Sequence, residues 1–205
     1  MDIAVALTTF LLIVPVELPD KTFVATLVLA TRYRPLPTWI GVGLAFAVQS
    51  LIAVTLGGLL TRLPHRPVTA AAGVLFLVGA IVLWRGAAQA DAEEAETEEE
   101  FAGKVRQGVS GLRAVGASFL VLFLAEWGDL SQLLTAGLVV RYQDPVSVFT
   151  GAWLALLLVS GIGALAGRTL LRFVRLSRVR RIGATVCAVL AVLTLLSAAG
   201  VATPI

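Results

Sequence analysis

Several residue types that commonly build soluble active sites are nearly absent from this chain of 205 residues. It has one cysteine, Cys187, one histidine, His65, and one methionine, Met1. A single cysteine excludes a disulfide within the chain. Without clusters of thiolate, thioether or imidazole groups, a soft-metal site cannot be assembled. Any metal bound here would therefore have to be a hard cation held by oxygen atoms.

Charge is also scarce. Charged residues make up 14% of the chain and hydrophobic residues 58%, with a mean hydropathy of +0.93 and a formal net charge of +3. Ordinary soluble domains have about 25% charged residues. The composition therefore excludes an ordinary soluble domain.

Long apolar runs are abundant instead. A membrane-spanning helix needs about 20 mostly apolar residues. Six candidate spans cover residues 3–30, 38–60, 68–84, 114–140, 146–167 and 182–199. Because these runs lack the alternation of a barrel strand, they predict helices. No basic region precedes the first run, so we expect that span to remain in the mature protein. The predicted fold is an all-α integral membrane protein with six transmembrane helices.

One polar segment separates the third and fourth spans. It contains the acidic run Asp91, Glu93, Glu94, Glu96, Glu98, Glu99 and Glu100. Such dense like charge is typical of a solvated, mobile linker. A functional alternative is that the run attracts or senses cations at one mouth of the protein. The predicted organisation is a first unit at 1–88, an acidic cytoplasmic linker at 89–113 and a second unit at 114–205.

Basic residues predict the orientation. Twelve of them lie in the loops between spans one and two, three and four, and five and six, whereas the other side has only Arg62, Arg66 and Arg141. The positive-inside rule makes the first set cytoplasmic and places both termini outside. The arginine-rich segment 168–181 is then topogenic, with lipid headgroup contact as a side effect. We expect no nucleic-acid partner.

An internal repeat relates the two halves. The segment 17–22, ELPDKT, recurs at 126–131 as EWGDLS, 109 positions later. The offset then becomes 110, matching Gly41 with Gly151 and Gly73 with Gly183. Three spans per copy would place the second copy upside down, as in the inverted repeats of secondary transporters. Each polar motif interrupts its own span, which predicts two interrupted motif helices at comparable depth.

Four carboxylates at membrane depth mark the candidate site. Each Asp costs at least about 2.5–3.5 kcal/mol to insert, so the default interpretation is functional. Within each motif the two acids are three residues apart and share a helix face, and inverted symmetry would bring the two pairs together. The candidate metal ligands are Glu17, Asp20, Thr22, Gln49, Glu126, Asp129, Ser131 and Gln132. Such an oxygen cage suits Ca²⁺, Mg²⁺ or Mn²⁺.

Structural roles are open alternatives for several of these residues. Asp20 or Asp129 can serve only as the N-cap of a second half-helix. Thr22 and Ser131 can bond back to their own backbone, and Gln49, like Ser50 and Ser160, can simply join helices. The two glutamates have no comparable capping role. Lys21 is expected to pair with the acids.

Protons should compete with a cation for this site. Four close carboxylates cannot all stay ionised in a medium of low dielectric constant, so some should bind protons when the site is empty. We therefore predict that proton binding and metal binding are mutually exclusive, as exchange requires.

With these residues in view, the chain resembles the GDT1 family. That family has two copies of E-x-G-D-[KR]-[ST], one in each three-helix half, and a charged loop between them. Its eukaryotic members include a Golgi transmembrane protein linked to manganese and calcium homeostasis. The resemblance implies exchange of Mn²⁺ or Ca²⁺ for protons and, in bacteria, manganese export across the cell membrane. The residues carried over by motif match are Glu17, Asp20, Thr22, Glu126, Asp129 and Ser131.

Two positions depart from the family pattern. Pro19 stands where the family has glycine, and Leu130 stands where it has lysine or arginine. Proline preserves a helix break. The loss of the second basic residue leaves the four acids facing only Lys21, which makes the site more negative by one charge. This change bears on metal selectivity and on proton stoichiometry.

The leading prediction is a secondary exporter of divalent cations that works by alternating access. It is not an enzyme, needs no resident cofactor and has the bilayer and the transported ion as partners, with a homodimer left open. An intramembrane aspartyl-type hydrolase is the first alternative, but it needs an acid and a base that differ, whereas both motifs carry near-equivalent sets. The second alternative is a passive channel or a structural subunit, but a channel favours a continuous polar stripe that these spans lack.

Overall fold

The computed structural model describes residues 1–18, 21–89, 96–97, 99–103, 110–173 and 176–201. Over these residues the chain forms helices and no strand. The helices are α1 Ile3–Glu17, α2 Lys21–Arg32, α3 Pro35–Leu60, α4 His65–Gly86, α6 Leu112–Ala125, α7 Leu130–Tyr142, α8 Pro145–Phe173 and α9 Leu176–Ala198. The predicted all-α class is therefore confirmed.

Four of these helices, α3, α4, α8 and α9, are each long and apolar enough to cross a membrane. The remaining four form two bent pairs, α1 with α2 and α6 with α7, and each pair bends by 74° at its break. Counting each pair as one span gives six candidate spans. Large apolar side chains such as Leu36, Leu44 and Leu154 are about half exposed or more, as expected where a helix faces lipid. The structure thus agrees with a multi-pass membrane protein whose first and fourth spans are interrupted.

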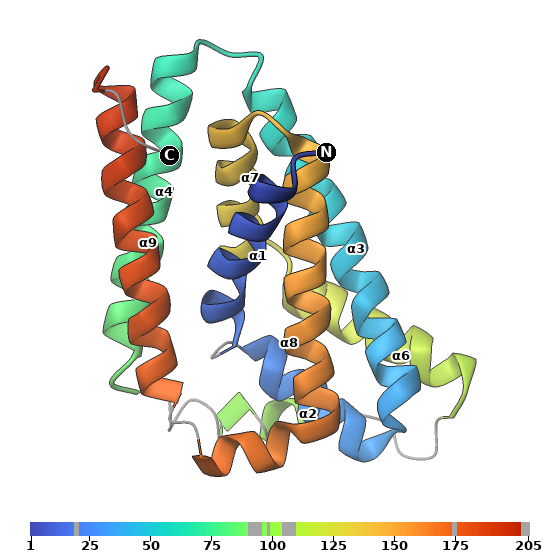
Figure 1. Cartoon of the computed structure of the whole chain (residues 1–205). Helices are drawn as coiled ribbons and strands as arrows, with labels where there is room; N and C mark the ends of the chain where they lie inside the picture. The colour runs from blue at the N-terminus through green and yellow to red at the C-terminus, as the bar shows by residue number, and fades with distance from the viewer. Residues whose placement is uncertain (19–20, 90–95, 98, 104–109, 174–175, 202–205) are drawn as a thin grey trace.

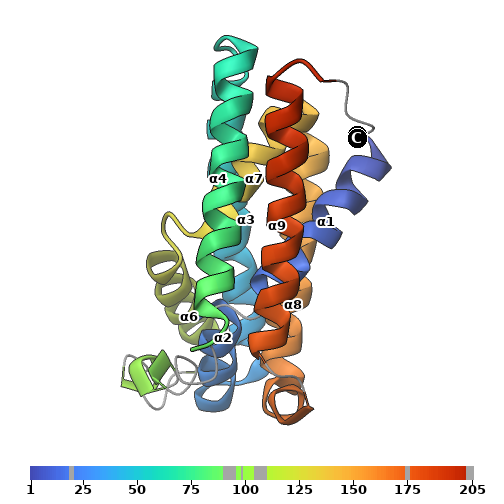
Figure 2. The same ribbon diagram turned by 90° about the vertical axis from the view of Figure 1, so that its left-hand side faces the viewer.

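The helices are arranged in layers across the bundle. Helices α4 and α9 lie side by side, and α1 and α7 lie between that pair and helices α8 and α3 (Figure 1; Figure 2). Helices α2 and α6 lie together at the end of the bundle away from the N-terminus (Figure 1). The backbone N–H of Asp2 donates to Ser147 Oγ at 2.7 Å, so the start of α1 meets the start of α8. Helix α8 follows directly after α7, so α7 ends near the point where α1 begins. The second broken span therefore finishes at the end of the bundle where the first one starts, and the two run in opposite directions.

Two glycines allow α3 and α8 to approach the other half of the chain closely. A Cβ atom on Gly41 of α3 would lie 2.3 Å from the carbonyl oxygen of Val115 in α6. A Cβ atom on Gly151 of α8 would lie 2.2 Å from the carbonyl oxygen of Ala6 in α1. Both crossings therefore require glycine, the residue that lets membrane helices pack backbone to backbone. The two crossings occupy equivalent positions of the sequence repeat.

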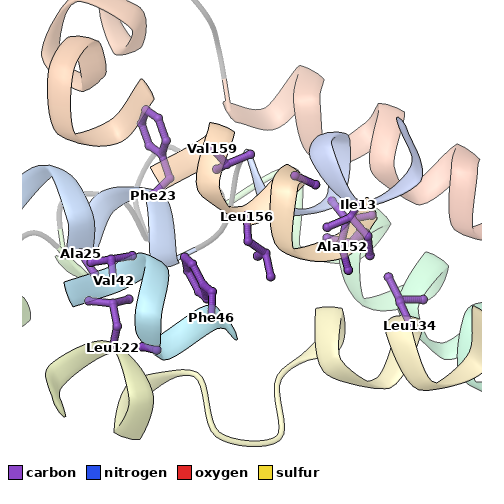
Figure 3. Close-up of a cluster of buried hydrophobic side chains, with 14 of the residues drawn as sticks. Ile13, Phe23, Ala25, Val42, Phe46, Leu122, Leu134, Ala152, Leu156 and Val159 are labelled. Carbon is purple, nitrogen blue, oxygen red and sulfur yellow. The ribbon is translucent and has the colours of Figure 1, made fainter. Parts of the chain in front are cut away.

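Buried apolar side chains from both halves form one core (Figure 3). Its members include Ile13, Phe23, Val42, Phe46, Leu122, Leu134, Leu156 and Val159, each at most 4% exposed. They come from α1, α2, α3, α6, α7 and α8, so the same core holds both broken spans. Burial of this surface fixes where the breaks lie within the bundle.

Part of the acidic linker is not solvated. Phe101 is 2% exposed and belongs to the main core, and Thr97 is 7% exposed. Glu99 and Glu100 beside Phe101 stay exposed. The described part of this linker is therefore docked to the bundle through an aromatic side chain while neighbouring acids face outward. Of the acidic run, residues 91–95 and Glu98 lie outside the described residues.

Candidate functional site

Two glutamates lie at the breaks of the interrupted spans. Glu17 is the last residue of α1 and Glu126 directly follows α6. Their exposed fractions are 1% and 4%. The two positions are equivalent in the repeat, and a buried acid at membrane depth is costly. The sequence prediction that both acids lie buried at a helix break is confirmed.

The second break has a backbone geometry that depends on a glycine. Helix α6 ends at Ala125, and the N–H of Glu126 still donates to the Leu122 carbonyl. Gly128 has a φ of +76°, a left-handed conformation that glycine adopts without the penalty of a Cβ atom. Helix α7 then begins at Leu130. The chain direction thus changes within four residues, 126–129, that all belong to the polar motif.

Asp129 is the N-cap of α7. Its Oδ1 accepts from the N–H of Gln132 at 3.0 Å, and its Oδ2 accepts from Ser131 Oγ at 2.8 Å. The structural alternative for Asp129 is therefore present in the molecule, and Ser131 bonds to this cap. Each carboxylate oxygen accepts more than one bond, so capping does not by itself exclude a ligand role.

Two glutamines bond to the backbone around Glu126. The side-chain Nε2 of Gln132 donates to the Glu126 carbonyl at 2.8 Å, and its Oε1 accepts from the N–H of Gly128 at 3.2 Å. From α3, Nε2 of Gln49 donates to the Phe123 carbonyl at 3.1 Å. Both predicted ligands therefore bond to the backbone within three residues of the second acid.

The first break is described on both of its sides. Thr22, on α2, is 1% exposed, and among the described residues its hydroxyl has no hydrogen-bond partner. The Thr22 carbonyl accepts from Thr26 Oγ1 at 2.8 Å. Pro19 and Asp20 lie outside the described residues, as does the side chain of Lys21. The predicted roles of Asp20 and Lys21 therefore stay predictions.

No complete metal cage is seen in the described part of the chain. There, no three histidine, cysteine, aspartate or glutamate side chains come close enough together to hold a metal ion. Glu17 and Glu126 are each described, whereas their motif partner Asp20 is not. The proposed ligand set of eight residues thus stays a prediction, with Glu126, Asp129, Ser131 and Gln132 placed within one short segment.

Sequence reasoning missed a second pair of buried hydroxyls. Thr9 and Ser118 are both fully buried, and their hydroxyls have no hydrogen-bond partner among the described residues. Their Cβ atoms would lie 2.9 Å and 3.0 Å from Cβ atoms built on Gly151 and Gly41. The two residues are 109 positions apart, which is also the offset between the two motifs. A comparison of the residues eight positions before each glutamate would therefore have found them.

Comparison with known sequences supports the motif-based resemblance. A profile of the family described as "Divalent cation/proton antiporter GDT1" matches residues 5–91 and 114–202. The match covers both helical units and omits most of the acidic linker. Both polar motifs and all eight candidate ligands fall inside the matched residues.

Individual relatives point the same way. A GDT1-like protein of the cyanobacterium Synechocystis is 34% identical over 172 residues, which is 80% of this chain and 83% of the relative. GDT1-like protein 4 of Oryza sativa is 28% identical over 82% of this chain, and chloroplastic protein PAM71 of Arabidopsis thaliana is 31% identical over 71%. The aligned parts make up 64% and 44% of these two plant proteins. No solved structure matches the chain.

Proposed function

This chain belongs to the GDT1 family of divalent cation/proton antiporters, and from that premise we propose that it exports Mn²⁺ or Ca²⁺ in exchange for protons. It is a transporter and not an enzyme, which sets aside the hydrolase alternative. The observation that carries the proposal is the burial of Glu17 and Glu126 at repeat-equivalent helix breaks. A buried acid that also binds protons is what an exchanger needs at its centre.

The mechanism we propose is alternating access by two inverted three-helix repeats. Three observations support it: both motif spans bend by 74°, they run in opposite directions, and Gly41 and Gly151 form equivalent crossings with the opposite repeat. In transporters built this way, the site lies near the membrane midplane between broken helices. Movement of one repeat against the other would open the site to each side in turn.

Competition between protons and metal provides the coupling. With no cation present, Glu17 and Glu126 are the proposed sites at which protons bind. A divalent cation favours the ionised form and would displace those protons, using the carboxylates with hydroxyl oxygens from Thr22 and Ser131. Because one site holds either ligand, inward movement of protons drives outward movement of the metal. We propose the cell membrane as its location, with both termini outside.

Transport in liposomes tests this function. Purified protein is reconstituted with a fluorescent indicator for Mn²⁺ or Ca²⁺, and flux is recorded with and without an imposed pH gradient. We expect gradient-dependent flux that Glu17→Gln and Glu126→Gln abolish, because each variant loses the exchangeable charge. Glu99→Gln, the same chemical change at an exposed linker residue, should transport normally. Unchanged flux in both buried-acid variants would show that the proposed site is wrong.

The pH dependence of metal binding gives a second test. Apparent metal affinity should fall as the pH is lowered, since protons occupy the same carboxylates. The measurement is a set of flux titrations at fixed internal pH. An affinity that does not change with pH would contradict proton competition even if the protein transports metal.

A further inference from the structure

The end of α6 is the part of the molecule where backbone and side-chain chemistry are most unusual. A helix leaves its last four carbonyl groups without intrahelical donors, and lipid offers none. At the end of α6 the Leu122 carbonyl is bonded by the Glu126 N–H and the Phe123 carbonyl by Gln49. The carbonyl of Glu126, just after the helix, is bonded by Gln132 and by the Asp129 N–H. Two side-chain amides from two other helices thus supply donors at this helix end, beside a buried acid.

Gln132 is engaged through both ends of its amide group. Its Nε2 donates to the Glu126 carbonyl, and its Oε1 accepts from the Gly128 N–H. These two bonds close a loop across the break, from the residue that carries the acid to the residue that makes the turn. A carboxamide is suited to this task because it carries a donor and an acceptor on one planar group.

The first break has no counterpart of this pair of amides. At the positions equivalent to Gln132 and Gln49 the chain has Phe23 and Val159. Both are fully buried in the main core and lie near each other in Figure 3. A pair of apolar side chains therefore occupies one break where a pair of amides occupies the other.

We propose that Gln49 and Gln132 are positioning residues whose amide groups hold the backbone at Phe123 and at Glu126, respectively, and are not ligands of the transported cation. The proposal rests on the proposed transport function, since it assigns these residues a place at that site. Gln49 fixes the end of α6 to α3, and Gln132 fixes it to α7. Hydrogen bonds from both neighbouring helices thereby fix the orientation of the backbone that carries Glu126.

Substitution by glutamate separates the two roles. A carboxylate is a better ligand for a hard cation than an amide, so a ligand role predicts that Gln132→Glu keeps or raises the apparent metal affinity. A positioning role predicts the opposite, because an ionised glutamate cannot donate to the Glu126 carbonyl and places an acceptor against it. We expect Gln132→Glu and Gln49→Glu to lose about tenfold or more in transport rate. The exposed Gln89→Glu is the matched control.

An uncharged variant covers the case in which the glutamate variants do not fold. Gln132→Met keeps the size of the side chain and removes the amide. We expect a thermal unfolding temperature close to that of the wild type, a lower maximal rate, and a shifted pH for half-maximal transport as Glu126 loses its fixed position. An unchanged rate and pH profile in Gln132→Met, or an active Gln132→Glu with raised metal affinity, would overturn the proposal.

Hydrogen exchange gives a readout that does not depend on transport. The Gly128 N–H is bonded to Gln132 Oε1, so the peptide covering residues 126–132 should exchange faster in Gln132→Met than in the wild type. Equal exchange would contradict the proposed bond. If the wild-type protein shows no metal flux while this peptide still differs, the transport function fails and the positioning role stands.

Discussion

The two broken spans bend by the same angle but are held by different chemistry. Pro15 lies inside α1, and Phe23 and Val159 fill the core beside the first break. At the second break, Gly128 supplies a positive φ, and two glutamines bond the surrounding backbone. The two helix pairs nevertheless bend equally, by 74°. The bend belongs to the fold, whereas the means of stabilising it is specific to each half.

This difference shows that, in the described part of the chain, the backbone around the two glutamates is supported in different ways. Hydrogen bonds depend strongly on direction, whereas apolar burial is non-directional and depends on area. Glu126 therefore follows a backbone fixed by directional bonds. Glu17 ends a helix packed mainly through apolar surface and close glycine contacts. Equivalent positions in a repeat can thus carry the same acid with different mechanical support.

The largest effect should come from exchanging the turn residues of the two motifs. Gly128→Pro places the residue of the first motif in the second. Proline fixes φ near −65° and excludes the observed +76°, so this variant should lose transport completely. The reverse change, Pro19→Gly, should keep transport, because glycine adopts any φ. Flux in liposomes measures both, and an active Gly128→Pro would mean that the second break tolerates a different backbone.

A smaller loss is expected at the two glycine crossings, and it should be equal in both halves. Gly41→Ala and Gly151→Ala each place a Cβ atom within 2.3 Å of a backbone oxygen. Such overpacking costs about 1–3 kcal/mol. Gly58→Ala on α3 meets no atom within 4 Å and should match or exceed wild-type stability. Thermal unfolding in detergent gives all three values, and a large difference between the first two would argue against equivalent crossings.

A change of charge at position 130 should have a smaller effect, on metal affinity. Leu130 packs against Gly79 of α4, with its Cδ1 2.9 Å from a Cβ atom built there. The equivalent residue of the first motif is Lys21. Leu130→Lys adds a positive charge near the second acid and should weaken metal binding by about 1 kcal/mol, roughly fivefold. Leu130→Met, similar in volume and neutral, is the control for packing, and flux titrations measure both affinities.

The smallest effect concerns the caps of α3 and α8. Hydrogen bonds from the Ser147 hydroxyl and N–H lower the pKa of the Asp144 carboxyl below its ordinary value of 3.8. Arg34, at the equivalent position before α3, makes no capping bond through its side chain in the described structure. Asp144→Ala should therefore lower the unfolding temperature slightly at neutral pH, whereas Arg34→Ala should not.

The sign of the pH dependence follows from the direction of that shift. A carboxyl whose pKa is lowered by folding stabilises the protein above its unfolded-state pKa, and this contribution is lost as the pH falls through the folded-state value. The difference between wild type and Asp144→Ala should thus fade below about pH 3–4. A difference that persists in stronger acid would assign the effect to something other than the ionised carboxylate.

Helix positions followed closely from the sequence because their signals are local. The run at 38–60 corresponds to α3 and the run at 146–167 to α8, and both helices begin a little earlier, at Pro35 and Pro145. Proline favours the first turn of a helix, where its missing N–H has no cost. Interruption of the first and fourth spans was also predictable, since each polar motif divides an apolar run.

The chemistry of the site was only partly predictable. Burial of Glu17 and Glu126 follows from their place within apolar runs. The roles of Gln49 and Gln132 do not, because an amide in a span can be a ligand, a cap or a bond between helices, and only its tertiary partner decides. Phe101 is a similar case, since one aromatic residue among many acids gives no local signal that it reaches the core.

Each glycine crossing lies at a distance from the glutamate of the same half-helix, so a rotation at the crossing displaces the acid. Thr9 at the crossing of α1 and α8 is eight residues before Glu17, and Ser118 at the crossing of α6 and α3 is eight before Glu126. Eight helical residues span about 12 Å. A rotation of about 10° at such a crossing would move the acid by about 2 Å, roughly ten times the tolerance in the length of a metal–oxygen bond. At the proposed metal site, a small tilt far from the ion would therefore be enough to make or break its coordination.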